Sequence, residues 1–285
     1  MYPFHTAAFA DADTPFDEAR YIIFGVPYDG TTSYRAGARE GPAAIRAVSF
    51  NFESYLVDYD LDLADVSICD AGDLDPSSLP DAVVADVEAA VRGICRAGKI
   101  PVMLGGEHSI TPGAVRAVLP EWYVVCDAHL DLRSEYGGTP DNHACACRRV
   151  LEDGMSNIVI VGARSGTREE YDIARRLHLY TADEVRKRGM NVVAEEIAGL
   201  IGGARTYLSI DADAIDCCST PGLGTPEPFG LSPWDVRTLV RALAPSVTGF
   251  DYVEVCPCDA GQTAAVAARI IRDFIGCHHT RTRER

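Results

Sequence analysis

Residues 122–131 read WYVVCDAHLD, a run of aromatic and β-branched residues that ends in Asp127, His129 and Asp131. The apolar part has the composition of a buried parallel strand. Because side chains alternate across a strand, the three polar residues would project from one face if the extended geometry continues. Ligands of an open α/β sheet bind outside the carboxyl ends of its strands. The stretch therefore predicts half of a metal site, and a loop with Asp as a cap and His as a filler is the alternative.

Two other predicted strands end in the same kind of residue. Residues 204–216 read ARTYLSIDADAID and place Asp211 and Asp213 two positions apart, and residues 99–109 read KIPVMLGGEHS, with His108 after a Gly-Gly turn. The three strands together offer two imidazoles and four carboxylates. This oxygen-rich set is too large for one tetrahedral ion and favours Mn²⁺ over a thiolate-type zinc site. Two ions that share carboxylates would use all six groups, so we predict a dinuclear centre.

The motifs GGEHS, DAHLD and SIDADAID, in this order, resemble the metal-binding motifs of the ureohydrolases, the family of arginase and agmatinase. Residues 23–41, IFGVPYDGTTSYRAGAREG, resemble the N-terminal strand and loop of that family. Residues 221–231, PGLGTPEPFGL, and residues 252–255, YVEV, resemble its two late motifs. The resemblance runs from about residue 20 to 275. It implies one three-layer α/β/α domain of the arginase-like fold with a mostly parallel sheet, two Mn²⁺ ions per subunit, and assembly into trimers or hexamers.

The residue patterns point to the same class of fold without the resemblance. Strand-like runs alternate with helical ones, for example the helical periodicity of residues 79–97, which stops at Gly98 before the strand-like run 100–104. Such alternation predicts one parallel sheet with helices on both faces. No linker, repeat or low-complexity stretch interrupts it, so a single domain is expected over residues 1–276. Residues 277–285, CHHTRTRER, are expected to form a frayed C-terminal tail.

The net charge and the apolar stretches of the chain limit the kinds of molecule that it is expected to bind. The net charge of −16 argues against nucleic acid, because phosphate binding needs clustered Lys and Arg. The charge suits a small cationic substrate by steering, although an acidic surface that keeps the protein soluble, or a salty cytoplasm, is the alternative. No stretch has the apolar length needed to span a bilayer, and the N-terminus lacks the pattern of a signal peptide.

The ten cysteines lack the C-x-x-C spacing of structural zinc sites. A protein of this size does not need disulfides, so a reduced, cytoplasmic location is the expected one. Cys217 and Cys218 follow the predicted metal loop directly. They could make the activity sensitive to oxidation.

Position by position, the resemblance implies one ion held by His108, Asp127, Asp131 and Asp211, and a second held by Asp127, His129, Asp211 and Asp213. It also implies that Asp131 orients the nucleophile and that Glu254 accepts paired hydrogen bonds from a guanidinium group. His143 would relay a proton to the leaving amine. The alternatives are a surface carboxylate for Glu254 and a helix-start histidine without a catalytic role for His143. Asp216 is either a support for the metal ligands or a turn former, and Glu107 is assigned no catalytic role.

The substrate follows from differences within the family. Arginases grip the α-carboxylate and α-amino group of arginine with an Asn where this chain has Arg133, and with a Ser/Asn-rich loop where it has SEYGGTPDNH. These differences count against arginine, although Arg133 could still bind a carboxylate. The segment GTPEP, with Glu227 as a further substrate-binding candidate, resembles the agmatinase version of the late loop.

The segments DLRSEY and NHACACRR resemble the archaeal agmatinase-like branch. We therefore expect hydrolysis of agmatine to putrescine and urea, a step of polyamine biosynthesis. The alternatives are N1-aminopropylagmatine, on a route to spermidine, and guanidinobutyrate. A non-catalytic metal-binding scaffold is the alternative from a different class of function.

Overall fold

The inner strands of the computed structural model, which describes residues 8–283, are mostly apolar runs that are buried on both faces of one sheet. In β1 (Tyr21–Val26), YIIFGV, every residue is buried. All neighbouring strands of the eight-stranded sheet are parallel. Its order is β4 (Ile68–Asp73), β1, β5 (Ile100–Gly105), β10 (Val247–Val253), β9 (Thr206–Asp211), β6 (Trp122–Cys126), β7 (Ile158–Ala163) and β8 (His178–Thr181). The strands β2 (Tyr55–Leu56) and β3 (Leu61–Asp62) form a separate antiparallel pair.

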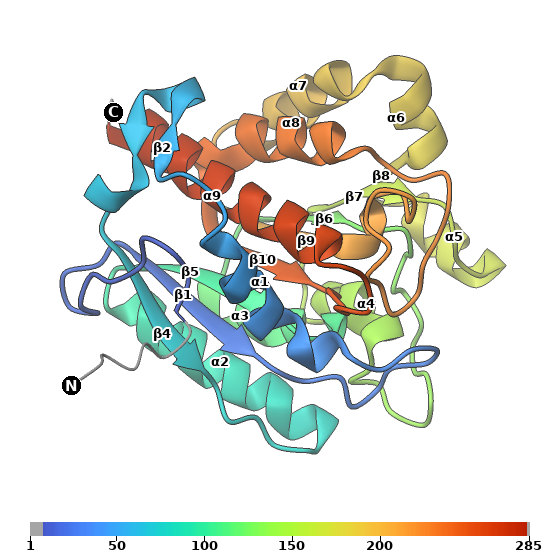
Figure 1. Cartoon of the computed structure of the whole chain (residues 1–285). Coiled ribbons are helices and arrows are strands. Elements are labelled where there is room, and N and C mark those ends of the chain that lie inside the picture. The colour runs from blue at the N-terminus through green and yellow to red at the C-terminus, as the bar shows by residue number, and fades with distance from the viewer. Residues whose placement is uncertain (1–7, 284–285) are drawn as a thin grey trace.

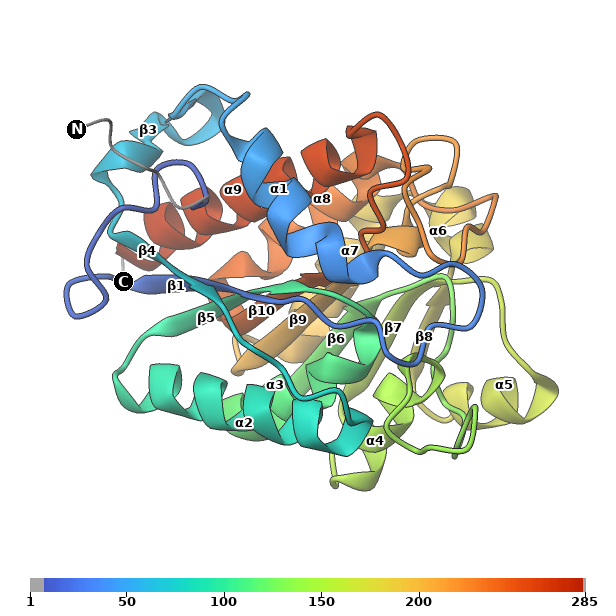
Figure 2. The same ribbon diagram turned by 60° about the horizontal axis from the view of Figure 1, so that its bottom comes forward.

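Helices cover both faces of the sheet (Figures 1 and 2). One layer holds α1 (Gly41–Ser49), α7 (Met190–Ile201), α8 (Pro233–Leu243) and α9 (Gln262–Arg283). The opposite layer holds α2 (Pro80–Arg96), α3 (Thr111–Val118) and α4 (Ala146–Glu152). The helices α5 (Arg168–Ala174) and α6 (Ala182–Arg188) lie at the β8 end of the sheet. The predicted three-layer α/β/α fold with a parallel sheet is therefore confirmed.

Two hydrophobic cores separate these layers, and the alternation of side chains along β1 shows how one strand serves both. Tyr21 and Ile23 join the core beneath α8 and α9, whereas Ile22 and Phe24 join the core above α2 and α3. The inner strands of the sheet thus bury apolar surface on two sides, at about 25 cal/mol for each Å² removed from water. This double burial explains why the strands read as continuous apolar runs.

The expectation of a frayed tail over residues 277–285 is wrong for residues 277–283. The helix α9 continues to Arg283, and Cys277, His278 and His279 are buried in it. The His278 Nδ1 atom lies 2.7 Å from the Tyr21 hydroxyl oxygen, and the two rings meet edge to face. Burial, together with nearby Arg20, lowers the pKa of His278 to about 4. The neutral imidazole therefore packs as an aromatic ring, although the polar composition of this segment predicts an exposed tail. Residues 284–285 lie outside the described part of the chain.

Two aspartates near the edge of the sheet form an ion-pair cluster with an arginine of α1. Asp70 and Asp73 belong to β4 and both pair with Arg46 of α1. The Arg46 Nε atom lies 2.7 Å from Asp70 Oδ2, and both side chains are almost fully buried. The cluster ties α1 to the edge strand, which the sequence spacing alone did not indicate.

Candidate metal centre

The candidate site lies at the carboxyl ends of the four central strands. The strands β5, β10, β9 and β6 are neighbours in the sheet, although they lie far apart in the sequence. His108 follows β5, Asp127, His129 and Asp131 follow β6, and Asp211 and Asp213 end and follow β9. Because parallel neighbours end at the same edge of a sheet, the three predicted ligand segments meet there. Glu254 follows β10, between two of these strands.

The six predicted ligands form two groups that share Asp127. In the first group, His108 Nδ1 lies 3.2 Å from Asp127 Oδ2, 3.4 Å from Asp131 Oδ2 and 3.2 Å from Asp211 Oδ2. In the second group, His129 Nδ1 lies 3.0 Å from Asp213 Oδ2 and 3.6 Å from Asp127 Oδ1. Asp127 thus turns one oxygen to each group. This is the arrangement that a carboxylate bridging two ions requires.

The chemistry of His108 supports a cation at this place. Its Nε2 atom lies 3.1 Å from Ser209 Oγ, and the Ser209 hydroxyl donates its hydrogen to Asp251 Oδ1 at 2.6 Å. The Ser209 oxygen must therefore accept from Nε2–H, which turns the other ring nitrogen, Nδ1, toward the carboxylates as the atom that can bind a metal ion. Among the residues that the structure describes, that buried Nδ1 atom has no hydrogen-bond partner, and it faces three carboxylate oxygens. A lone pair among carboxylates is repulsive unless a cation lies between them.

The pKa shifts of the carboxylates also indicate a cation at this place. Burial, and then the charge of neighbouring carboxylates, raises the pKa of Asp131 and Asp211 well above the usual range. Two divalent cations would offset the four aspartate charges and remove this penalty. Nitrogen and oxygen donors in two groups that share one residue fit a dinuclear metal site.

The backbone holds the ligands in place without help from an ion. The Ala128 N–H donates to Asp213 Oδ1 at 3.1 Å, and the Asp213 N–H donates to Asp211 Oδ1 at 2.8 Å. Asp131 has a φ of 49° and Glu254 a φ of 63°, in the left-handed region that non-glycine residues rarely adopt. Such strain gathers at functional sites, where the surrounding structure fixes it.

A buried polar network behind His108 was not predicted from the sequence. Asp251 of β10 is fully buried and accepts hydrogen bonds from Ser209, from Tyr207 at 2.7 Å and from Thr111 at 3.0 Å. The network sets the orientation of the His108 ring. A charged residue inside the buried strand TGFDYV was the available signal, because such a residue needs partners.

A cavity of about 310 Å³ opens over the two metal groups, and three of the four predicted substrate-binding residues line it: Glu254, His143 and Arg133. Glu254 is buried, and its Oε1 atom accepts the His108 N–H at 2.7 Å. Burial, and then the neighbouring Glu107, raises the pKa of Glu254 to about 8. The His143 ring stacks on Tyr136 at 6.2 Å, and burial lowers the pKa of His143 to about 4. His143 therefore stands in the cavity as a neutral imidazole.

Arg133 and Glu227 lie farther out. Arg133 lines the cavity, its guanidinium lies 4.6 Å from the centre of the Tyr136 ring, and its Nε atom lies 3.6 Å from Glu170 Oε2. This partner already offsets the charge that would attract a substrate carboxylate. The Glu227 Oε1 atom lies 3.7 Å from His129 Nε2, so Glu227 approaches the outer side of the second metal group.

Arg164 was missed in the sequence, yet it ties the metal loop to the loop that carries Glu227. Its guanidinium donates to the carbonyl oxygens of Asp213 at 2.7 Å and of Glu227 and Pro228 at 2.9 Å each. It also reaches the carbonyl of Gly162 at 3.2 Å. The planar guanidinium, with five N–H donors, suits this convergence of carbonyl groups.

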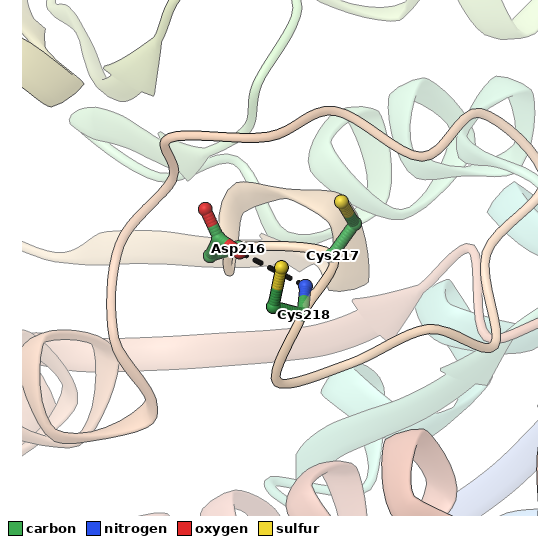
Figure 3. Close-up of side chains that lie close together, drawn as sticks. All are labelled: Asp216, Cys217 and Cys218. Carbon is green, nitrogen blue, oxygen red and sulfur yellow. Dashed lines mark hydrogen bonds between the residues drawn. The ribbon is translucent and has the colours of Figure 1, made fainter.

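Asp216 forms the turn that opens the same loop. Its Oδ1 atom accepts the Cys218 N–H, and its Oδ2 atom accepts the Gly230 N–H, each at 2.9 Å. These bonds favour the turn-former reading over support of the metal ligands. Cys217 and Cys218 are free thiols beside Asp216 (Figure 3), and Cys218 is exposed.

Within residues 8–283, no helix combines the length and the apolar character that crossing a membrane demands.

Comparison with known proteins agrees with this geometry. The N(1)-aminopropylagmatine ureohydrolase of Thermococcus kodakarensis is 43% identical over 268 residues, which cover 91% of each chain. The agmatinase of Pyrococcus horikoshii is 42% identical over 265 residues, which cover 91% of this chain and 92% of the relative.

Solved structures extend the likeness to the whole fold. The agmatine ureohydrolase of Thermoplasma volcanium matches with a TM-score of 0.94 and 41% identity, over 99% of this chain and 97% of that chain. The formiminoglutamase of Trypanosoma cruzi, solved with Mn²⁺, matches with a TM-score of 0.84 and 26% identity, over 92% of this chain and 94% of that chain. Residues 19–277 match the Arginase family as a whole. The fold, the order of the motifs and these matches show that the chain belongs to the Arginase family.

Proposed function

We propose that this protein hydrolyses agmatine to putrescine and urea. The observation that carries the proposal is the meeting of two metal groups, a buried carboxylate and a neutral imidazole in one cavity: Asp127 bridges the groups, and Glu254 and His143 face them. The relatives named for agmatine support the choice of substrate. The broader expectation, a hydrolase that acts on the C–N bond of a guanidino group, is confirmed by family membership.

The residues of the cavity match the needs of the reaction. A guanidinium carbon is a poor electrophile because resonance spreads its charge over three nitrogens, and a divalent ion supplies a stronger nucleophile by lowering the pKa of bound water toward 7. Glu254 would bind the guanidinium through charge-assisted hydrogen bonds. Asp131 would orient the attacking oxygen, and His143 would pass a proton to the alkyl nitrogen as its bond to carbon breaks.

We propose Mn²⁺ as the ion in both positions. His108, Asp127, Asp131 and Asp211 would hold one ion, and Asp127, His129, Asp211 and Asp213 the other. Oxygen-rich ligands with one imidazole per ion suit Mn²⁺, and a structural neighbour was solved with it. The proposal includes a homo-oligomer, a trimer or hexamer, located in the cytoplasm, which light scattering and cell fractionation would test.

The second candidate substrate is N1-aminopropylagmatine, which the relative from Thermococcus kodakarensis favours. Guanidinobutyrate is disfavoured by the contact between Arg133 and Glu170, since a substrate carboxylate would have to compete with Glu170. A non-catalytic scaffold is disfavoured because all six ligands are present and converge.

The test is urea release after loading with Mn²⁺, with agmatine, N1-aminopropylagmatine, guanidinobutyrate and arginine compared side by side. Agmatine should lead, and arginine should give no urea. A lead of the aminopropyl compound by more than about tenfold, which is about 1.4 kcal/mol of transition-state stabilisation, would assign that substrate instead. No urea from any of the four, with metal bound according to elemental analysis, would overturn the proposed function.

A further inference from the structure

Glu107 is a buried carboxylate that the proposed reaction does not use. It is fully buried, and within residues 8–283 it forms no ion pair with a Lys, Arg or His side chain. Its oxygens are met by hydrogen-bond donors from the N-terminal loop and from the start of the next helix. Oε1 accepts from the Thr31 hydroxyl at 2.5 Å and the Ser109 hydroxyl at 2.6 Å, and Oε2 accepts from the Thr31 N–H at 2.8 Å. A buried charge held only in this way is costly, so its retention calls for a reason.

Thr31 connects this carboxylate to His143. The Thr31 oxygen accepts the His143 N–H at 3.0 Å, across 112 positions of sequence. Because the Thr31 hydroxyl has one hydrogen, which it gives to Glu107, the direction of the chain is fixed: His143 N–H donates to Thr31, and Thr31 O–H donates to Glu107. A hydroxyl that donates to a carboxylate is polarised and becomes a better acceptor.

The bond to Thr31 satisfies the start of a short helix. His143 is the first residue of the 3-10 helix His143–Cys145, whose leading N–H groups have no partner inside the helix. The Asn142 side chain accepts the Ala144 N–H at 3.0 Å, which leaves the His143 N–H for Thr31. The backbone that carries the imidazole is therefore anchored from both sides. The ring itself rests on Tyr136 at the wall of the cavity.

We propose that Thr31 and Glu107 are positioning residues that hold His143 at the distance the leaving amine requires. The inference rests on the proposed function, because only a reaction with a leaving amine needs a proton at that place. A misplacement of about 1 Å of a catalytic group can lower a rate about 100-fold. The pair thus ties the N-terminal loop, the metal-bearing strand end and the proton relay into one unit.

The kinetic test compares Thr31→Val with Thr31→Ser in the Mn²⁺-loaded enzyme, with Thr32→Val as the matched control. The Thr32 hydroxyl donates to the Asp29 carbonyl at 3.0 Å and lies 3.4 Å from Glu107 Oε2, so Thr32→Val removes a long contact with the same carboxylate but leaves the link from Glu107 through Thr31 to His143 in place. Thr31→Val should lower kcat about 10- to 100-fold with KM changed less than about threefold, Thr31→Ser should restore the rate, and Thr32→Val should match the native enzyme. Equal kcat in Thr31→Val and the native enzyme, or an equal loss in Thr32→Val, would overturn the inference.

A double-mutant cycle separates positioning from general stability. In the His143→Ala background, Thr31→Val should cause no further loss, because the group that it positions is already gone. Glu107→Gln should behave like Thr31→Val, since the groups that face the carboxylate are donors and the new amide NH₂ would lack an acceptor. A full additional loss in the His143→Ala background would show that Thr31 acts elsewhere and would overturn the inference.

A readout without turnover keeps this inference separate from the proposed function. Carbethoxylation of His143 by diethylpyrocarbonate, followed by mass spectrometry of its peptide, should become severalfold faster in Thr31→Val and remain at the native rate in Thr31→Ser and Thr32→Val. An unchanged His143 rate in Thr31→Val would overturn the positioning role even if the native enzyme released no urea. Melting temperatures and metal content of each variant serve as folding controls.

Discussion

Replacement of Glu254 by Gln is the most direct test of substrate recognition in the cavity. Gln has the size of Glu, and its carbonyl oxygen can still accept the His108 N–H that Glu254 Oε1 accepts at 2.7 Å. What is lost is the negative charge that would face the guanidinium group of the substrate. The substitution therefore separates recognition from the local fold.

The magnitude follows from the type of hydrogen bond. A hydrogen bond to a charged group contributes about 1.5–3 kcal/mol. At about 1.36 kcal/mol per factor of ten, kcat/KM for agmatine should fall about 10- to 150-fold. Stability should move the other way: burial, and then the neighbouring Glu107, raises the pKa of Glu254 to about 8, so a neutral side chain removes the cost of burying this carboxylate in the free protein. The melting temperature should stay the same or rise.

The assay is steady-state urea release from agmatine, with thermal unfolding followed by circular dichroism and metal content measured on the same samples. Glu152→Gln is the control, because Glu152 pairs with Arg148 on the surface of α4 and lies outside the cavity. A Glu254→Gln enzyme within about twofold of the native kcat/KM would refute a role in guanidinium recognition. A melting temperature several degrees lower would instead assign Glu254 a structural role.

Three further predictions concern the metal centre, the loop that carries Glu227 and the C-terminal helix. Removal of the metal by a chelator should abolish urea release and lower the melting temperature, because the buried carboxylates lose their counter-charges. Added Mn²⁺ should restore both the activity and the melting temperature. Activity in protein shown to be metal-free by elemental analysis would contradict the dinuclear centre. Arg164→Lys should raise KM for agmatine about tenfold or more, because the Lys ammonium cannot replace the fork that reaches both the Glu227 and the Pro228 carbonyls, and one lost charge-assisted hydrogen bond contributes about 1.5–3 kcal/mol. An unchanged KM would show that Arg164 does not hold this loop. Because burial, with help from Arg20 and His279, lowers the pKa of His278 from 6.5 to about 4, the unfolded chain binds the proton first and stability should fall as pH decreases from 6.5 to 4. The gap multiplied by 1.36 kcal/mol gives about 3 kcal/mol, and urea unfolding should show that the native protein loses about this much more stability than His278→Phe, in which His143 and His279 still become protonated on unfolding.

The sequence alone was sufficient to predict the layers of the fold and the residues that meet at the candidate metal centre. Both depend on local patterns: the apolar run 122–126 identifies a buried strand, and the polar residues that follow identify its functional end. Parallel strands end at one edge of a sheet, so three such segments predict a common site before their order in the sheet is known.

Only the tertiary structure shows which polar residues hold other residues in place. Four polar residues form hydrogen bonds with groups that lie far away in the chain, and no local pattern records such a pairing. They are Asp251, Thr31, Glu107 and Arg164. Residues 277–283 show the same limit, because a polar segment becomes core once a neutral imidazole finds Tyr21 across the fold. Local sequence specifies backbone geometry and ligand type, whereas the cost of burying a polar group is offset only by contacts that the folded chain brings together.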